Sequence, residues 1–136
     1  MKRRALRRGW RVDTAAAGAK KPAMTSTLPL VALGGALGAS LRHFATLLWP
    51  APWGVMAVNV AGSFLIGVLA IRLSPTAAPF LLAGVLGGFT TFSAFSLDAL
   101  RLIEGGRPAA AALYVAGSIG LSLLACAAGL WLGRVA

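Results

Sequence analysis

The sequence contains few charged residues and almost no acidic ones. Only 12% of its 136 residues are charged, whereas an average soluble domain has about 25%. Three residues are acidic, and none of them lies between Leu28 and Leu97. Three acids and one histidine form no plausible catalytic constellation. We therefore do not expect an enzyme.

Cysteine is nearly absent as well. Cys126 is the single cysteine, so the chain can form neither an intrachain disulfide nor a cysteine-rich metal cluster. It lies within a long apolar run, where we expect it to act as a small buried hydrophobic side chain. We also expect no secretory signal, because no apolar core of about 7–15 residues precedes a small-residue cleavage site ahead of the first long run.

The sequence does contain long apolar stretches. Hydrophobic residues make up 58% of the chain, and four runs of 18 to 25 residues are nearly free of charge. About 20 such residues are needed for a helix to cross a bilayer. The pattern predicts an all-α, multi-pass protein of the inner (plasma) membrane with four transmembrane helices. The runs are Leu28–Trp49, Gly54–Ile71, Phe80–Leu97 and Ala109–Gly133.

Basic residues are concentrated at the N-terminus. Eight of the thirteen lysines and arginines fall in the first 21 positions. We divide the chain into a basic disordered tail (1–27), a four-helix transmembrane domain (28–133) and a short C-terminal end (134–136). The tail is expected to be attracted to anionic lipid; we expect no nucleic-acid partner, since Trp10 is its only aromatic residue. Alternatively, translation starts at Met24.

The third apolar run contains a stretch that does not suit a plain lipid-facing helix. Gly87–Ser96 reads GGFTTFSAFS, with two adjacent glycines and four hydroxyl residues. Adjacent glycines weaken a helix by about 1 kcal/mol each relative to alanine. Non-helical backbone at membrane depth is tolerated only where protein or a water-filled cavity covers it. We therefore predict that the third helix is broken at Gly87–Thr90 and that a functional site lies there.

Polar side chains in the other runs fall into register. Asn59 and Ser63 are four residues apart and so share one helix face; Asn59 either forms interhelical hydrogen bonds or turns its amide toward a pore. In the fourth run Tyr114, Ser118 and Ser122 recur every four residues, which indicates a polar track along one face.

Arg42 and His43 lie near the end of the first run. Arg42 either extends its charge to the membrane surface or faces an aqueous vestibule that concentrates anions. His43 is expected to be an interfacial residue, because no second histidine and no carboxylate lies nearby in the sequence.

The charges of the loops give no preferred orientation for the four-helix body. Arg72 and Arg134 would lie on one side of the membrane, and Arg101 and Arg107 on the other. Since basic loops set orientation, such a body could insert in both directions, and an antiparallel homodimer would be natural. Counting the basic tail instead favours an N-terminus on the cytoplasmic side.

Taken together, three segments resemble the Fluc (CrcB) family of fluoride channels. The resemblance extends from about Leu28 to Leu132. It implies a fluoride-selective channel that lowers cytoplasmic fluoride by passive export down the electrochemical gradient. It also implies an antiparallel, dual-topology homodimer with two pores. The segments are Gly34–His43, Val58–Gly67 and Gly87–Ser96.

The resemblance further implies roles for individual residues. A structural sodium ion would be held at the dimer centre by the backbone carbonyls of Gly87 and Thr90. His43 departs from the family where an aromatic residue is common, and Ala94 where threonine is common. Arg42 would line the vestibule. The residues implied for the fluoride pore are Asn59, Phe92, Ser93, Phe95, Tyr114, Ser118 and Ser122.

These residue types suit an anion that is small and strongly hydrated. Conduction needs binding that is strong enough for the ion to enter and weak enough for it to leave. Amide and hydroxyl groups donate hydrogen bonds without a fixed positive charge. Phenylalanine rings are positive at their edges, so Phe92 and Phe95 could turn ring edges toward an anion.

Two other functions remain as alternatives. One is a proton-coupled exporter of the small multidrug-resistance type, although that mechanism needs a membrane-buried carboxylate, which Leu28–Leu97 lacks. The other is a non-transporting membrane assembly protein, which leaves the polar third run unexplained.

Overall fold

The computed structural model describes residues 24–136, and within this range every regular element is a helix. The predictions for the tail before Met24 lie outside the described residues. The elements in chain order are α1 (Met24–Leu48), α2 (Trp53–Leu69), the π-helix η2 (Pro79–Leu86), α3 (Gly87–Phe89), α4 (Phe92–Glu104) and α5 (Pro108–Val135).

Three segments are long and apolar enough to cross a membrane: Thr27–Leu48, Pro79–Glu104 and Pro108–Val135. This confirms the all-helical, multi-pass class. The fourth predicted span corresponds to α2, an apolar helix of 17 residues. That length is at the lower limit of about 17–25 residues for a membrane helix, so the crossing of α2 stays a prediction.

The helix boundaries differ from the sequence-based ones by a few residues. α1 begins at Met24, four residues before the predicted start of the first run at Leu28. The third segment continues through α4 to Glu104, whereas we expected it to end near Asp98. Charge near a helix end made these limits hard to see, because a helix that leaves the membrane can continue into water.

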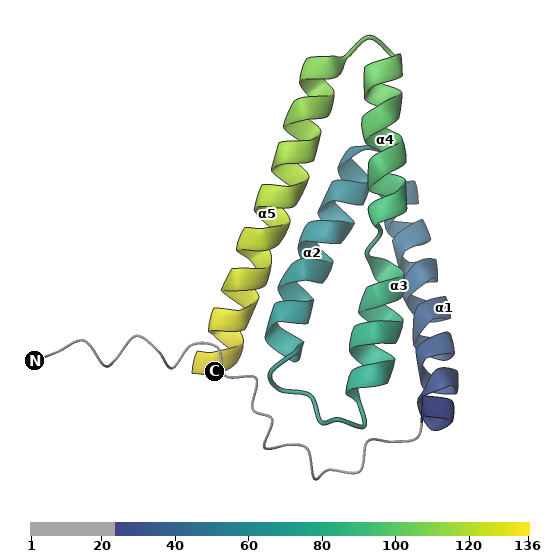
Figure 1. The fold of residues 1–136 in the computed structure, drawn as a ribbon, viewed down its shortest axis with the longest axis vertical. Helices are drawn as coiled ribbons and strands as arrows, with labels where there is room; N and C mark the ends of the chain where they lie inside the picture. The colour runs from purple at the N-terminus through teal and green to yellow at the C-terminus, as the bar shows by residue number, and fades with distance from the viewer. Residues whose placement is uncertain (1–23) are drawn as a thin grey trace, which may run out of the picture.

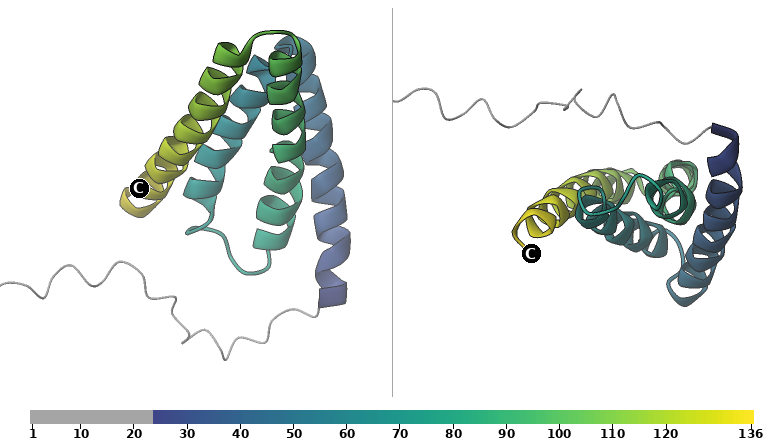
Figure 2. Two further views of the ribbon diagram at one scale, coloured as in Figure 1. Left: turned by 45° about the horizontal axis from the view of Figure 1, so that its top comes forward. Right: turned by 90° about the horizontal axis from the view of Figure 1, so that it is seen from below.

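The helices pack as two pairs that share one end. α2 lies along α5, and α1 lies along η2 and α3, as Figures 1 and 2 show. α4 continues from the third segment and meets α5 at a short turn containing Gly105 and Gly106, the latter with a φ of 71°. The broken third segment therefore lies between α1 on one side and the α2–α5 pair on the other.

Glycine allows the closest of these approaches. A Cβ atom added at Gly38 of α1 would collide with the backbone carbonyl oxygen of Val85 in η2. A Cβ added at Gly129 of α5 would collide with the carbonyl of Phe64 in α2. Small residues at membrane helix interfaces let backbones come this near, which accounts for both pairs.

The buried core is small and lies at the end where α2, α4 and α5 meet. It consists of Val55, Phe95, Ala99 and Tyr114. Many leucines on the outer faces of α1 and α5 are exposed in this single chain. Lipid tails are as apolar as leucine, so an exposed apolar surface is expected for membrane helices.

The third segment is broken, as predicted, but the break begins later than Gly87. Gly87 is helical, with φ −64° and ψ −36°, and Gly87–Phe89 forms the short helix α3. The extended residues are Thr90 (φ −78°, ψ 155°) and Thr91 (φ −153°, ψ 123°). The predicted range of Gly87–Thr90 therefore overlaps the observed break only at Thr90, because glycine permits a break without forcing one.

Candidate functional site

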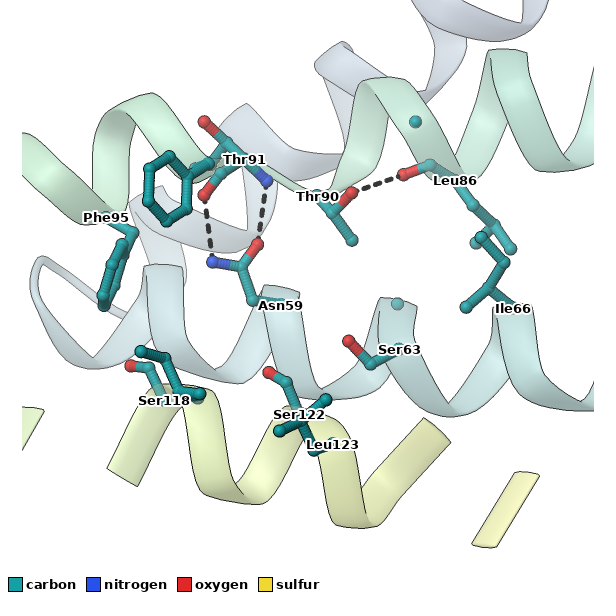
Figure 3. Close-up of a pocket in the computed structure, with 14 residues that line it drawn as sticks. Asn59, Ser63, Ile66, Leu86, Thr90, Thr91, Phe95, Ser118, Ser122 and Leu123 are labelled. Atoms are coloured by element: carbon teal, nitrogen blue, oxygen red, sulfur yellow. Dashed lines mark hydrogen bonds between the residues drawn. The ribbon is translucent and has the colours of Figure 1, made fainter. Parts of the chain in front are cut away.

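The helix break opens into a cavity, which we call the larger cavity to distinguish it from a second one lined by Arg42. The larger cavity has a volume of about 570 Å³ and lies between α2, the broken third segment and α5 (Figure 3). Seven residues predicted for the site line it: Asn59, Gly87, Thr90, Phe92, Phe95, Ser118 and Ser122. The structure thus brings together side chains from three helices that are far apart in the sequence.

Asn59 holds the break open from the neighbouring helix. Its Oδ1 accepts a hydrogen bond from the Thr91 backbone N–H at 2.8 Å, and its Nδ2 donates to the Thr91 carbonyl at 3.0 Å (Figure 3). The amide therefore satisfies both backbone groups that the extended Thr91 cannot use in a helix. Interhelical hydrogen bonding, one of the two interpretations of Asn59, is confirmed, and the residue also lines the cavity.

Thr91 also starts the next helix. It is the N-cap of α4, and its Oγ1 accepts a hydrogen bond from the Ala94 N–H at 3.2 Å. N-cap hydroxyls satisfy one of the N–H groups that a helix start leaves free. The Ser93 Oγ lies 3.1 Å from the same Oγ1, so Ser93, predicted for the pore, interacts here with the cap and is not among the residues that line the larger cavity.

The break leaves carbonyl groups without their usual helical donors. In a continuous helix the Thr91 N–H would bind the Gly87 carbonyl, but it binds Asn59 instead. The Thr90 carbonyl accepts a long hydrogen bond of 3.5 Å from Arg42 Nη1, and the Thr90 hydroxyl donates to the Leu86 carbonyl at 2.9 Å. Carbonyl oxygens have two lone pairs, so Gly87 and Thr90 can each accept more.

Three aromatic rings follow one another along α4 and α5. The Phe92 and Phe95 centroids are 5.4 Å apart with their planes at 40°, and those of Phe95 and Tyr114 are 5.3 Å apart at 37°. Both distances are in the range of favourable aromatic pairs. Phe92 exposes 77% of its surface, whereas Phe95 exposes only 6%. The row thus runs from the surface of this chain into its core.

The predicted polar track of α5 is only partly aligned with the cavity. Ser118 and Ser122 line it. Tyr114 does not, because it is 1% exposed and packs against Phe95 in the core.

Arg42 lines the smaller cavity, which has a volume of about 320 Å³. His43, Asp98 and Arg101 line it too. Asp98 is buried, and its Oδ1 lies 3.9 Å from Arg101 Nη1. The sequence indicated the cationic lining through Arg42, but it gave no reason to place Asp98 and His43 in one cavity.

Sequence reasoning missed Thr91 and Asp98. For Thr91 a signal existed: threonine is a favoured N-cap, and here it is followed directly by the helical run that begins at Phe92. For Asp98 the only signal was its spacing of three from Arg101, which is typical of any exposed helical ion pair. The apolar part of the cavity lining, for example Ile66 and Leu123, carries no distinguishing pattern.

The fold and the cavity define a small polytopic membrane protein with a polar site at a helix break. Comparison with known proteins is consistent with that class. Residues 29–130 match the family described as CrcB-like protein, Camphor Resistance (CrcB). The chain therefore belongs to the CrcB family.

Similar proteins come from several bacteria and are each named fluoride-specific ion channel FluC. A relative in Cereibacter sphaeroides is 55% identical over 116 residues, which cover 79% of this chain and 94% of the relative. One in Rhizobium meliloti is 52% identical over 118 residues, covering 77% and 94%. One in Paracoccus denitrificans is 50% identical over 120 residues, covering 82% and 97%.

Proposed function

We propose that this protein is a fluoride-selective ion channel that exports fluoride passively from the cytoplasm. The observation that carries the proposal is the larger cavity, which is lined by hydrogen-bond donors and aromatic side chains. The chain belongs to a family whose relatives are named fluoride channels. Asn59 contributes an amide, Ser118 and Ser122 contribute hydroxyls, and Phe92 and Phe95 contribute aromatic rings.

The lining suits transient binding of a small anion. Amide and hydroxyl groups replace part of the water shell of the ion, and no lysine or arginine lines the larger cavity. A fixed cation there would bind the anion too tightly for rapid release. Arg42 lines the smaller cavity instead, where its charge can raise the local concentration of anions before they reach the pore.

We further propose that the pore is completed by a second, antiparallel copy of the chain. Phe92 and Ser122 line a cavity that is open in the single chain, and Phe92 is 77% exposed. Polar groups and backbone at a helix break are costly to leave against lipid. A second copy would cover them, and the two-against-two balance of loop arginines allows opposite insertion.

A structural sodium ion fits the backbone at the break. The carbonyl of Gly87 lacks its helical donor, and that of Thr90 has only the 3.5 Å bond from Arg42. Hard cations prefer oxygen ligands, so these two carbonyls are suitable. Two carbonyls from one chain are few for a cation, and the equivalent pair from a second copy would complete the ligand set. When bound, the ion would offset the repulsion between the carbonyl dipoles of the two copies.

The proposal is tested with purified protein in liposomes whose membrane potential is clamped. We expect fluoride to be released and chloride to be retained, because the cavity is built for a small anion that needs strong hydrogen bonds. Equal efflux of both ions, or no efflux of either, would contradict channel function with fluoride selectivity.

The aromatic part of the pore is tested with Phe92→Ile and Phe95→Ile. Isoleucine keeps an apolar side chain but has no positive ring edge, so we expect fluoride flux to fall in both variants. Phe44→Ile is the matched control, since Phe44 is exposed on α1 and lines neither cavity. A sizing column verifies that each variant keeps the assembly of the wild type. Undiminished flux in both pore variants would remove the aromatic rings from the argument.

A further inference from the structure

Three buried polar atoms stand out between α4 and α5. The Asp98 Oδ2, the Tyr114 hydroxyl and the Ser118 hydroxyl are buried, and within residues 24–136 none of them makes a hydrogen bond. Buried polar groups nearly always have a partner, and each exception in a native structure needs an explanation. Their occurrence together indicates a shared role.

The trio connects the two cavities. Asp98 lines the smaller cavity, and Ser118 lines the larger one. Tyr114 and Ser118 are four residues apart on α5 and so share one face of that helix. Asp98 lies one turn after Phe95 on α4, and the Phe95 ring packs on that of Tyr114 with centroids 5.3 Å apart. Hydroxyl hydrogens rotate about the C–O bond, so the three groups can be joined into one chain of hydrogen bonds, either directly or through a bridging water.

The surroundings of Asp98 supply both charge and access to protons. Arg101 on α4 is 3.9 Å away, but its side chain is 65% exposed, so water screens much of its charge. Arg42 and His43 of α1 line the same cavity. Tyr114 faces Asp98 from α5, and α2 contains no titratable residue.

We propose that Asp98 is a positioning residue whose protonation sets the direction in which Tyr114 and Ser118 donate their hydrogen bonds, and thereby the affinity of the pore for an anion. The inference rests on the proposed fluoride channel and adds a regulation by pH to it. The proton is taken from the water of the smaller cavity and returned to it, and no bond other than O–H changes.

The direction of donation follows from the number of hydrogens. An ionised carboxylate only accepts, so it takes the hydrogen of Tyr114, and Tyr114 in turn accepts from Ser118. Ser118 then presents a lone pair to the larger cavity, which repels an anion. A protonated Asp98 donates to Tyr114, Tyr114 donates to Ser118, and Ser118 turns its hydrogen toward the cavity, where it stabilises an anion.

The experiment compares fluoride currents of wild type and Asp98→Asn between about pH 5.5 and about pH 8. Vesicles without protein correct for permeation of HF. The protonated fraction of a carboxyl falls about tenfold per pH unit above its pKa. We therefore expect the wild-type current to fall by at least about threefold as pH rises, whereas Asp98→Asn, whose amide can donate at every pH, stays constant and high.

Three further variants separate the relay from a structural role. Asp98→Glu keeps a titrating carboxyl and should keep the pH dependence. Tyr114→Phe removes the middle hydroxyl and should abolish it. His43→Gln should leave it in place, which identifies the carboxyl and not the histidine as the titrating group. In addition, infrared difference spectra of the wild type should show a carboxylic acid band that Asp98→Asn lacks, independently of transport.

A pH dependence that persists unchanged in Asp98→Asn, or one that disappears in His43→Gln, overturns the relay. The relay is also overturned if the wild-type current is independent of pH and the infrared spectra show no buried carboxyl that titrates. These results leave the channel itself intact. The absence of fluoride current in the wild type at any pH would instead contradict the proposed function.

Discussion

Removing the Asn59 amide should destabilise the protein by exposing a defect at the helix break. Asn59→Ala deletes both partners of the Thr91 backbone, whose N–H and carbonyl are bonded at 2.8 and 3.0 Å. Thr91 is buried, so only water of the larger cavity, which Thr91 lines, could replace the lost partners. The extended pair Thr90–Thr91 would then lose the interactions that hold it out of the helix.

The size of the effect follows from those two bonds. Interhelical side-chain hydrogen bonds in a membrane protein contribute about 0.6 kcal/mol on average and about 1.7 at most. Two bonds therefore predict a loss of about 1–3 kcal/mol in the free energy of unfolding. A buried amide or carbonyl left without a partner costs about 1–3 kcal/mol, so we expect the upper half of this range.

The measurement is unfolding by detergent titration, with hydrogen exchange of the Thr91 amide as a local probe. Ser63→Ala is the matched control, because Ser63 lies one turn further along α2 and lines the same cavity. We expect this control to change the free energy of unfolding by less than about 0.5 kcal/mol, which is typical of substitutions that break no named interaction. If Asn59→Ala is as stable as Ser63→Ala, or if Thr91 exchange is unchanged, Asn59 does not hold the break.

Two more stability predictions concern close contacts at the same segment. Gly38→Ala should destabilise the protein by about 1–3 kcal/mol, because the new Cβ would collide with the Val85 carbonyl. Gly35→Ala is the control and should not destabilise it, because a Cβ at Gly35 would enter open space. Equal melting temperatures for both variants would contradict the packing of α1 against η2. Thr91→Val should cost about 1 kcal/mol through loss of the cap to Ala94, and Thr91→Ser should recover it, as measured by thermal unfolding.

The class of the protein could be predicted because it depends on composition and run length alone. Four apolar runs of membrane-spanning length and a shortage of charged residues are sufficient to predict a multi-pass helical protein. The ends of the helices were harder to predict from the sequence. The third segment continues to Glu104 past Asp98 because charges stop a lipid-facing stretch without stopping the helix.

Most of the residues predicted for the site line the larger cavity, but Ser93 and Tyr114 do not. Helical spacing places Ser118 and Ser122 on one face from sequence alone, and both line the cavity. The position of the break depends on Asn59, which lies 32 residues from Thr91 in the sequence. No local pattern contains that contact, so the glycines drew the prediction to Gly87 although the backbone becomes extended at Thr90.

Asn59 shows why a broken helix in a membrane and a polar pore occur together. The side-chain amide has two N–H groups and one carbonyl; the carbonyl and one N–H are used by Thr91. Asn59 lines the cavity, so in the proposed pore it has one N–H left to donate to an ion and not the two that the free side chain offers. The same residue that satisfies the broken backbone therefore limits how tightly the pore can hold an anion. Rapid conduction requires weak binding. The helix break is costly for folding, but because it occupies part of the Asn59 amide it keeps Asn59 from binding an anion too strongly.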